Sequence, residues 1–130
     1  MYTIAQAAAR SGLSVYTLRY YDKEGLLPFV ERGASGARSF SDRDLNWLSL
    51  ISCLKNTGMP IKDIRHYVEW YLMGDDTLTL RLDMFTNHRE KMLEQMAQLQ
   101  QYMTKIDKKI EVYQGYVKAG TQGGRRAVED

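Results

Sequence analysis

The chain has 130 residues, a formal net charge of +2, and 44% hydrophobic and 26% charged residues. These values are ordinary for one small soluble domain, or for a small domain with an extension. No run of about eighteen apolar residues occurs and the start does not resemble a signal peptide, so we expect a cytoplasmic protein with no membrane partner. The single cysteine, Cys53, excludes an intramolecular disulfide and cysteine-rich zinc sites.

Basic residues are slightly in excess near the N-terminus. Residues 1–40 hold five basic and three acidic side chains, whereas residues 74–130 hold nine of each. This excess favours an anionic partner for the N-terminal part. The sequence has no glycine-rich phosphate loop, no Ser/His/Asp set and no paired-carboxylate motif. We therefore expect no enzyme, no cofactor and no bound metal.

The N-terminal region predicts two short helices joined by a tight turn. Thr3 and Gln6 fit a capping box, which begins a helix that Gly12 ends. Ser14 then caps a second helix over about residues 15–23. Two short helices joined by a glycine-containing turn are typical of a helix-turn-helix.

A β-hairpin and two further helices are predicted next. Residues 26–40 hold extended-chain formers and a glycine-rich turn, the pattern of a short hairpin, or wing. Residues 41–44 form a second capping-box pattern, which opens a third helix that runs to about Thr57. Pro60 suits the first turn of a fourth helix, over about residues 61–73.

The last segment has the clearest periodicity. From Leu78 to Val117, twelve positions alternate spacings of four and three residues, and eleven of them are apolar, which indicates a heptad seam. At 1.5 Å per residue this helix would be about 60 Å long. A small N-terminal core cannot cover such a stripe, so we expect self-association, with an intramolecular helical hairpin as the alternative. The residues predicted to pack across the dimer are Met92, Met96, Leu99, Met103, Ile106 and Ile110.

The second helix has an unusual surface. Tyr16, Arg19, Tyr20 and Lys23 share one face by their three- and four-residue spacing, while Leu18 points to the core. Arginine and lysine neutralise phosphates or read guanine, and tyrosine hydroxyls bond phosphate oxygens. The alternative is that the aromatic rings pack beneath the wing and Arg19 is only solvated. Together with the wing and the seam, this face favours a DNA-binding protein.

Neighbouring residues could extend this surface. Thr17 and the amides near Ser14 would add phosphate contacts at a helix N-terminus. Arg32 and Arg38 on the wing would follow the flanking backbone. The helical spacing leaves the position of Tyr21 undecided.

Two stretches resemble a known family. "YTIAQAAARSGLSVYTLRYYDKEGLLPFVER", followed by "RSFSDRDLNWLSLISCLKNTGMPIKDI", is similar to the MerR family of bacterial transcription regulators over residues 2 to about 71. The resemblance implies a mainly α fold, with a winged helix-turn-helix DNA-binding domain at residues 1–73. It also implies a long antiparallel coiled-coil dimerisation helix at residues 77–118. Residues 119–130 are Gly-rich and polar, which predicts a flexible tail.

The function implied by this resemblance is promoter regulation. Family members are homodimers that bend and untwist double-stranded promoter DNA with an overlong spacer, so that RNA polymerase can engage both recognition elements. Carried over to this chain, the resemblance makes Arg19, Tyr20 and Tyr21 DNA contacts and Arg38 a wing contact. The full set predicted to contact DNA is Thr3, Ser14, Tyr16, Thr17, Arg19, Tyr20, Tyr21, Lys23, Arg32 and Arg38.

The resemblance also bears on sensing. Metal-sensing members carry cysteines at the start of the dimerisation helix or in a C-terminal loop, and this chain has no cysteine after Cys53. Drug-sensing members append a large effector domain. The sequence looks most like the thiol-based NmlR/AdhR-type subfamily, which responds to aldehydes and other electrophiles. By this resemblance Cys53 is the candidate sensor thiol, and Lys55, Lys62, Arg65 or His66 would favour its thiolate if they lie nearby.

Other interpretations stay open. Cys53 could be an inert packing residue, because a lone cysteine in an apolar helix is usually a small core residue. It lies one position off the core row of its helix. Trp47 and Trp70 could line a pocket for a non-covalent effector instead of packing in the core or an interface. An architectural DNA-binding protein would need no sensor at all. A thiol-dependent enzyme would need a base, which we do not recognise.

Overall fold

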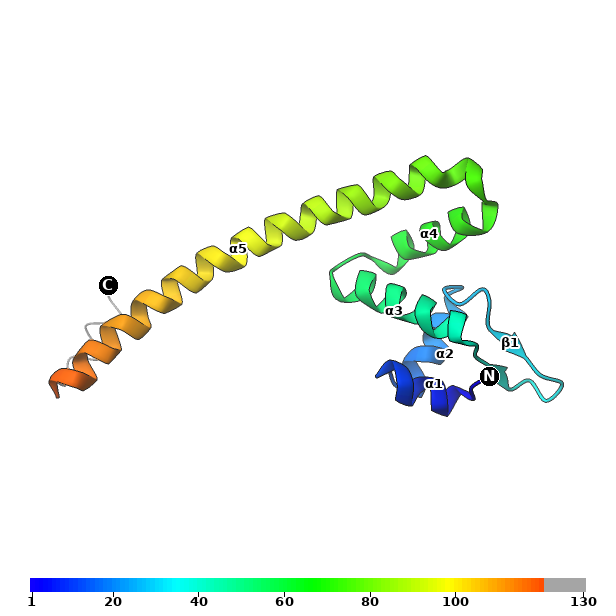
Figure 1. Ribbon diagram of the computed structural model, residues 1–130, viewed down its shortest axis with the longest axis horizontal. Coiled ribbons are helices and arrows are strands. Elements are labelled where there is room, and N and C mark those ends of the chain that lie inside the picture. Colours follow the sequence, from blue (N-terminus) through cyan, green and yellow to red (C-terminus); the bar gives the residue numbers. More distant parts are fainter. Residues whose placement is uncertain (121–130) are drawn as a thin grey trace. The chain divides into compact units, whose positions relative to one another are not determined.

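The computed structural model describes residues 1–120, which fall into two units. The first unit ends at His88 and the second begins at Arg89. The elements are helices α1 (Ile4–Ser11), α2 (Val15–Lys23), α3 (Asp42–Asn56), α4 (Ile61–Met73) and α5 (Leu78–Ala119), strands β1 (Glu31–Arg32) and β2 (Arg38–Ser39), and the 3₁₀ turn η1 (Asp75–Thr77) (Figure 1). The predicted fold class, a mainly helical winged helix-turn-helix followed by one long helix, is confirmed.

Helices α1 and α2 form the helix-turn-helix, and a side-chain cap begins each of them. The Thr3 hydroxyl accepts a hydrogen bond from the Gln6 amide, and the Gln6 side chain accepts one from the Thr3 amide. The Ser14 hydroxyl accepts a hydrogen bond from the Thr17 amide. Gly12 closes α1 with a φ of 74°, a left-handed conformation that glycine adopts without strain. The predicted starts of both helices are therefore confirmed.

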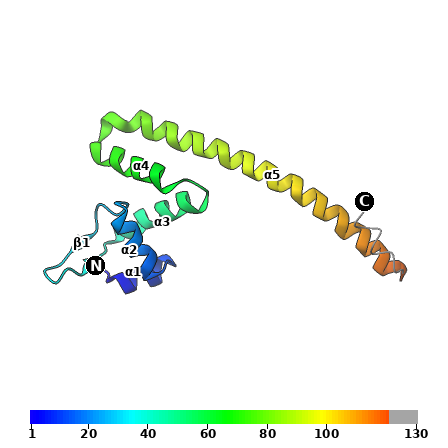
Figure 2. The ribbon, with the colours of Figure 1, turned by 180° about the vertical axis from the view of Figure 1, so that it is seen from behind.

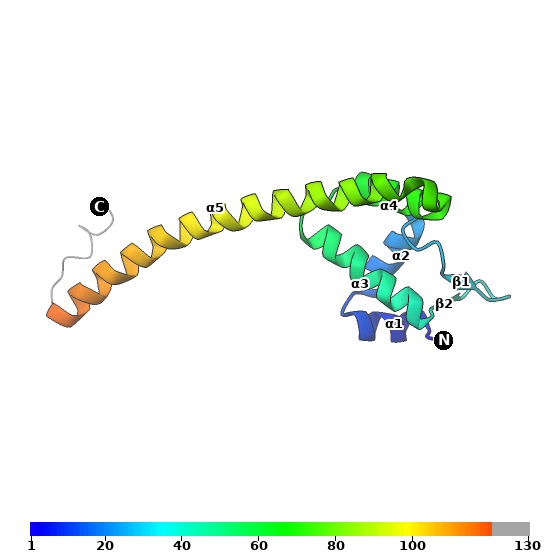
Figure 3. The same ribbon diagram turned by 45° about the horizontal axis from the view of Figure 1, so that its top comes forward.

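Strands β1 and β2 form the wing, which extends beyond the helices of the first unit (Figure 3). The strands are antiparallel, and their pairs are Glu31 with Ser39 and Arg32 with Arg38. Each strand has only two residues. The hairpin is shorter than the predicted stretch of residues 26–40. Leu26 and Leu27 are buried in the core, and a turn follows them in which the Val30 amide donates to the Leu27 carbonyl at 3.4 Å.

Helices α3 and α4 run side by side in opposite directions, joined by a short turn (Figure 2). The Ser41 hydroxyl and the Asp44 carboxylate form the predicted capping box of α3. Pro60 is the N-cap of α4, not a residue of its first turn as predicted. Its φ of −62° fits either position, but its ψ of 148° is extended, so the helix itself begins at Ile61, in agreement with the predicted span of residues 61–73.

The core of the first unit is formed by side chains of its helices and of the residues that flank the wing. Its largest fully buried side chains are Leu18, Leu26, Phe40, Leu48, Ile51 and Ile64. Beside them is an aromatic cluster formed by Phe29, Trp47, Tyr67, Tyr71 and Phe85. Trp47 is buried there, and its indole N–H donates to the Leu26 carbonyl at 2.7 Å. The expectation that Trp47 packs in the core is therefore confirmed.

The first turns of α5 belong to the first unit. The Phe85 ring meets the Tyr67 ring edge-on, with centroids 5.0 Å apart, which ties these turns to α4. The contact boundary at residues 88 and 89 therefore falls inside α5, beyond the predicted domain end at residue 73. The assignment of residues 1–73 and 77–118 to separate functions stays a prediction.

The second unit consists of the rest of α5 within the described chain. No residue of α5 is buried. Across residues 1–120, no helix combines the length and apolar character that crossing a membrane requires. The predicted tail at residues 119–130 lies, from residue 121 onward, outside the described residues.

Candidate nucleic-acid interface

The outward face of α2 carries the side chains that the sequence predicts for it. Tyr16 is 81% exposed and Tyr20 is 39% exposed. Arg19 and Lys23 are also exposed, and within residues 1–120 neither has an ion-pair partner. On the opposite side of the helix, Leu18 is fully buried. The core thus fixes the helix and leaves two cations and two phenols available to a partner.

Tyr21 has a different environment from its neighbour Tyr20. Only 5% of Tyr21 is exposed, and its ring lies 6.1 Å from the Tyr20 ring, tilted by 48°. Burial raises the pKa of the Tyr21 hydroxyl above its usual value. The family resemblance assigns Tyr21 to DNA contact, but the ring is a core residue. Its contact stays a prediction, limited to the small exposed part of the residue.

The caps at the helix starts occupy hydroxyls that the sequence assigns to DNA. The Ser14 hydroxyl donates to the Thr17 hydroxyl at 2.9 Å while it accepts from the Thr17 amide at 3.0 Å. Thr3 accepts from the Gln6 amide at 3.1 Å. These side chains order the ends of α1 and α2. Phosphate contact by Thr3, Ser14 and Thr17 stays a prediction.

The two wing arginines share one carboxylate on α2. The Arg38 Nε donates to the Asp22 Oδ2 at 2.7 Å, and the Arg32 Nη2 donates to the same oxygen at 3.0 Å. The side chains of Arg38 and Asp22 are 19% and 18% exposed, whereas that of Arg32 is 55% exposed. Sequence reasoning missed Asp22. An acidic residue in a basic region is a weak signal, and its partners lie 10 and 16 residues away.

Two further contacts hold the interface helix and the wing base to α3 and α4. The Arg65 Nη1 donates to the Glu24 Oε2 at 2.8 Å, which joins the end of α2 to α4. The Arg43 guanidinium lies 3.9 Å from the centre of the Phe29 ring and also donates to the Tyr71 hydroxyl at 3.3 Å. Phe29, two residues before the wing, is therefore held against both α3 and α4.

Cys53 is exposed on α3, while Ile51 and Leu54 on the same helix are buried. Its place outside the core weakens the interpretation that the thiol only fills space. Of the cations proposed to favour its thiolate, Arg65 is paired with Glu24. His66 stacks on Trp70 and lies 3.6 Å from a Glu69 carboxylate oxygen.

A histidine that the sequence reasoning did not connect with Cys53 lies near the end of the same helix. The Thr57 hydroxyl donates to the Cys53 carbonyl at 2.7 Å and lies 2.7 Å from the His88 Nε2. The imidazole thereby joins the end of α3 to α5 within the first unit. Within residues 1–120 no group of three or more His, Cys, Asp or Glu side chains is placed to hold a metal ion.

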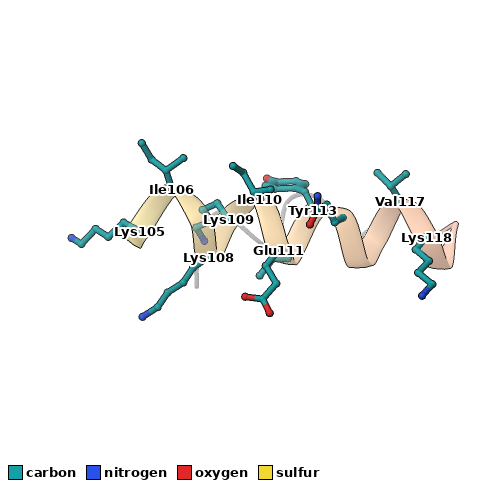
Figure 4. Close-up of a pocket in the computed structure, with 11 residues that line it drawn as sticks. Lys105, Ile106, Lys108, Lys109, Ile110, Glu111, Tyr113, Val117 and Lys118 are labelled. Carbon is teal, nitrogen blue, oxygen red and sulfur yellow. The ribbon is translucent and has the colours of Figure 1, made fainter. Parts of the chain in front are cut away.

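The predicted dimer seam is an open apolar surface. Met96, Leu99 and Met103 are 64%, 65% and 52% exposed, and Met92 is half-buried. Ile106 and Ile110 project from the same side of the helix as Val117, whereas Lys108 and Glu111 project from the other side (Figure 4). Apolar residues that repeat along one helix and remain half exposed mark a protein-binding surface.

Comparison with known proteins assigns the family. The sequence model of the MerR HTH family regulatory protein matches residues 2–70, and a second model, described as MerR, DNA binding, matches residues 45–109. An uncharacterized HTH-type transcriptional regulator of Haemophilus influenzae is 49% identical, over 98% of this chain and 92% of that protein. The HTH-type transcriptional regulator AdhR of Bacillus subtilis is 36% identical, over 70% of this chain and 65% of its own.

Solved structures agree with this assignment. One is the crystal structure of HiNmlR, a MerR family regulator lacking the sensor domain, bound to promoter DNA. It is 48% identical with a TM-score of 0.85, and the match covers 92% of this chain and 95% of that chain. A MerR family regulator from Bacillus thuringiensis is 39% identical with a TM-score of 0.78, over 86% and 98% of the two chains.

Proposed function

The chain belongs to the MerR family of DNA-binding transcription regulators, and from this premise we propose that it acts as a homodimer that reshapes promoter DNA. One observation carries the proposal. The α2 face of Tyr16, Arg19, Tyr20 and Lys23 is exposed, and neither cation has an ion-pair partner within residues 1–120. The similarity to HiNmlR, which was crystallised bound to promoter DNA, supports DNA as the partner of this face.

The mode of contact follows from the chemistry of the face. An α-helix fits the major groove, where an arginine such as Arg19 makes two hydrogen bonds to guanine or one strong contact to phosphate. The exposed phenols of Tyr16 and Tyr20 donate to phosphate oxygens and fix the register. Arg32 and Arg38 contact the flanking backbone from the wing.

A second copy of the chain covers the exposed seam of α5. The seam residues from Leu99 to Ile110 are about half exposed, and a single helix offers nothing to bury them. Pairing two such helices removes both stripes from water. In the antiparallel arrangement implied by the family, the two helix-turn-helix motifs lie at opposite ends of the coiled coil. Two-fold symmetry then requires two half-sites in the operator.

The dimer acts on DNA shape. A dimer whose two recognition helices do not match the half-site spacing of straight B-DNA binds only when the duplex bends and untwists. The deformation costs a few kcal/mol, which the phosphate and base contacts offset. In a promoter with an overlong spacer, this deformation brings the two recognition elements into register for RNA polymerase.

Modification of Cys53 is the proposed switch. Its exposure allows an electrophile to reach the sulfur. With an aldehyde, the thiolate sulfur bonds to the carbonyl carbon, and the carbonyl oxygen takes a proton from water, which gives a hemithioacetal. The backbone carbonyl of Cys53 accepts from Thr57, which contacts His88, so the adduct lies beside a link between α3 and α5.

Run-off transcription from the promoter region next to the protein's own gene tests this function. Wild type and Cys53→Ser are compared with and without formaldehyde or methylglyoxal, and DNA affinity is measured in parallel. We expect activation in wild type only, with equal DNA affinity for the two proteins. An equal response in both would move sensing to a non-covalent effector. Specific DNA binding with no response to a wider effector screen would instead favour an architectural role.

A further inference from the structure

We propose that Asp22 is a positioning residue of the DNA interface, which holds the two wing arginines against the recognition helix before DNA arrives. This inference rests on the proposed function. One oxygen, Oδ2, accepts from the Arg38 Nε at 2.7 Å and from the Arg32 Nη2 at 3.0 Å. We call these three side chains the wing triad. It is the only contact within residues 1–120 in which one carboxylate pairs with two arginines.

The register of the wing explains why a carboxylate is needed there. Arg32 and Arg38 are direct cross-strand partners. Like charges at such a pair destabilise a hairpin, because their β-carbons lie only about 5 Å apart. Each strand has two residues, and so short a hairpin is marginal in water without further support. Asp22 supplies the opposite charge from outside the hairpin and joins it to α2.

The triad leaves donors available for a phosphate. Asp22 occupies the Nε of Arg38, and within the described residues no acceptor binds the two terminal nitrogens of that guanidinium. Those nitrogens form the fork that binds two oxygens of one phosphate. The triad carries a net charge of +1, so it still attracts DNA. The phosphate therefore meets arginines that are already ordered, and less conformational entropy is lost on binding.

This arrangement predicts opposite effects on two kinds of binding. In Asp22→Asn the triad gains one net positive charge, so affinity for random DNA should rise. The slope of log affinity against log salt for random DNA should steepen by about 0.9, the value for one added phosphate contact. Promoter affinity should fall by about tenfold, roughly one charge-assisted contact, because the wing is no longer ordered. A carboxylate that served only folding would lower both affinities together and leave the slope unchanged.

The experiment uses the full chain and two duplexes, the promoter sequence and a scrambled one, across a series of salt concentrations. Fluorescence anisotropy gives both affinities and their salt slopes. Hydrogen exchange of the wing amides, including the Gly33 amide that bonds to the Ala37 carbonyl at 2.9 Å, reports wing order without DNA. Glu24→Gln is the matched control, because it removes the same charge close to Asp22 but breaks a pair with Arg65 on α4. Asp22→Glu tests whether restored charge restores order.

We expect faster wing exchange and lower promoter preference in Asp22→Asn, neither change in Glu24→Gln, and partial recovery in Asp22→Glu. An Asp22→Asn protein whose wing exchange and salt slope match those of Glu24→Gln would overturn the proposal. If wild type does not prefer promoter DNA, the proposed function fails, while wing exchange in the free chain still decides the role of Asp22.

Arg32→Gln is a second variant that keeps the test decisive even if Asp22→Asn unfolds. The Arg32 side chain is 55% exposed, so its replacement leaves the core intact. It also removes the repulsion across the wing, so the wing amides should stay protected at the wild-type level. Rapid wing exchange in Arg32→Gln would show that neutralising the cross-strand pair is not what Asp22 does.

Discussion

Helix α2 and the second unit of α5 are both surface helices, but they leave opposite kinds of side chain in water. Helix α2 buries Leu18 and presents charged and phenolic groups. The described part of the second unit buries no residue and presents a repeating row of methionine, leucine and isoleucine. Groups that form strong hydrogen bonds suit a polyanion, whereas an uncovered apolar row suits a like surface. The chemistry of the exposed face therefore indicates a different partner for each region.

The largest expected effect comes from a charge in the apolar region. Leu99→Asp should dissociate the proposed dimer, because two carboxylates would be buried unpaired at a cost of several kcal/mol each. Sedimentation velocity measures the change. Gln98→Asp, with an equal charge next to the seam, should remain dimeric. A Leu99→Asp protein that sediments as a dimer would place the self-association surface elsewhere. The apolar row of α5 would then no longer contrast with α2 as a surface for a second copy of the chain.

A smaller effect is expected from the DNA-facing region. Arg19→Ala should weaken promoter binding by about 1–3 kcal/mol if Arg19 makes a bidentate base contact. It should not change the oligomeric state, because its site is remote in sequence from the seam. Lys55→Ala, which removes an exposed cation of α3, is the control in the same anisotropy titration. Equal losses in the two variants would mean that Arg19 contributes charge only.

The cap of α2 should affect the stability of the first unit without affecting the apolar row of α5. Ser14→Ala should destabilise the first unit by about 1 kcal/mol, because the Thr17 amide loses its acceptor. The sedimentation coefficient should stay at the wild-type value. Ser14→Asn, another favourable cap, should retain most of the stability in urea unfolding. Stability equal to wild type in Ser14→Ala would show that this hydrogen bond is replaced by water.

The smallest effect concerns alkaline pH. Burial raises the pKa of Tyr67 above its ordinary value of 10.0. The folded state therefore favours the neutral phenol of Tyr67 more than the unfolded state does. This contribution to the free energy of unfolding is complete below pH 10.0 and is lost as the pH rises through the pKa of the folded state. Tyr67→Phe should therefore lose less stability than wild type between neutral and strongly alkaline pH. Urea unfolding measures the free energy of unfolding of both proteins across that pH range. If wild type and Tyr67→Phe lose equal stability, the alkaline loss belongs to other groups, such as Tyr21.

Local patterns explain what the sequence could predict. The caps at Thr3, Ser14 and Ser41 depend on residues three positions apart, and the α2 face depends on spacings of three and four. A heptad row is equally local. These features are encoded within one or two turns of helix, so their prediction needs no tertiary information.

Contacts between distant residues explain what the sequence could not predict. The wing triad depends on the register of two strands relative to α2, and the Thr57–His88 contact spans 31 residues. Tyr21 lies at the edge of the helical face, where only packing decides between core and surface. The extent of the first unit depends on Phe85, whose contact with Tyr67 no periodicity reveals.

Because Phe85 packs against the core of the first unit, the two parts of α5 should be protected from proteases in different ways. The turns up to His88 are held by the aromatic cluster within one chain, so their protection is independent of concentration. The turns after Arg89 have no core of their own, and a solitary helix is only marginally stable in water. We therefore expect cleavage beyond Arg89 to slow as the protein concentration rises and the seam is covered. The abundance of such a regulator would then set its own rate of turnover.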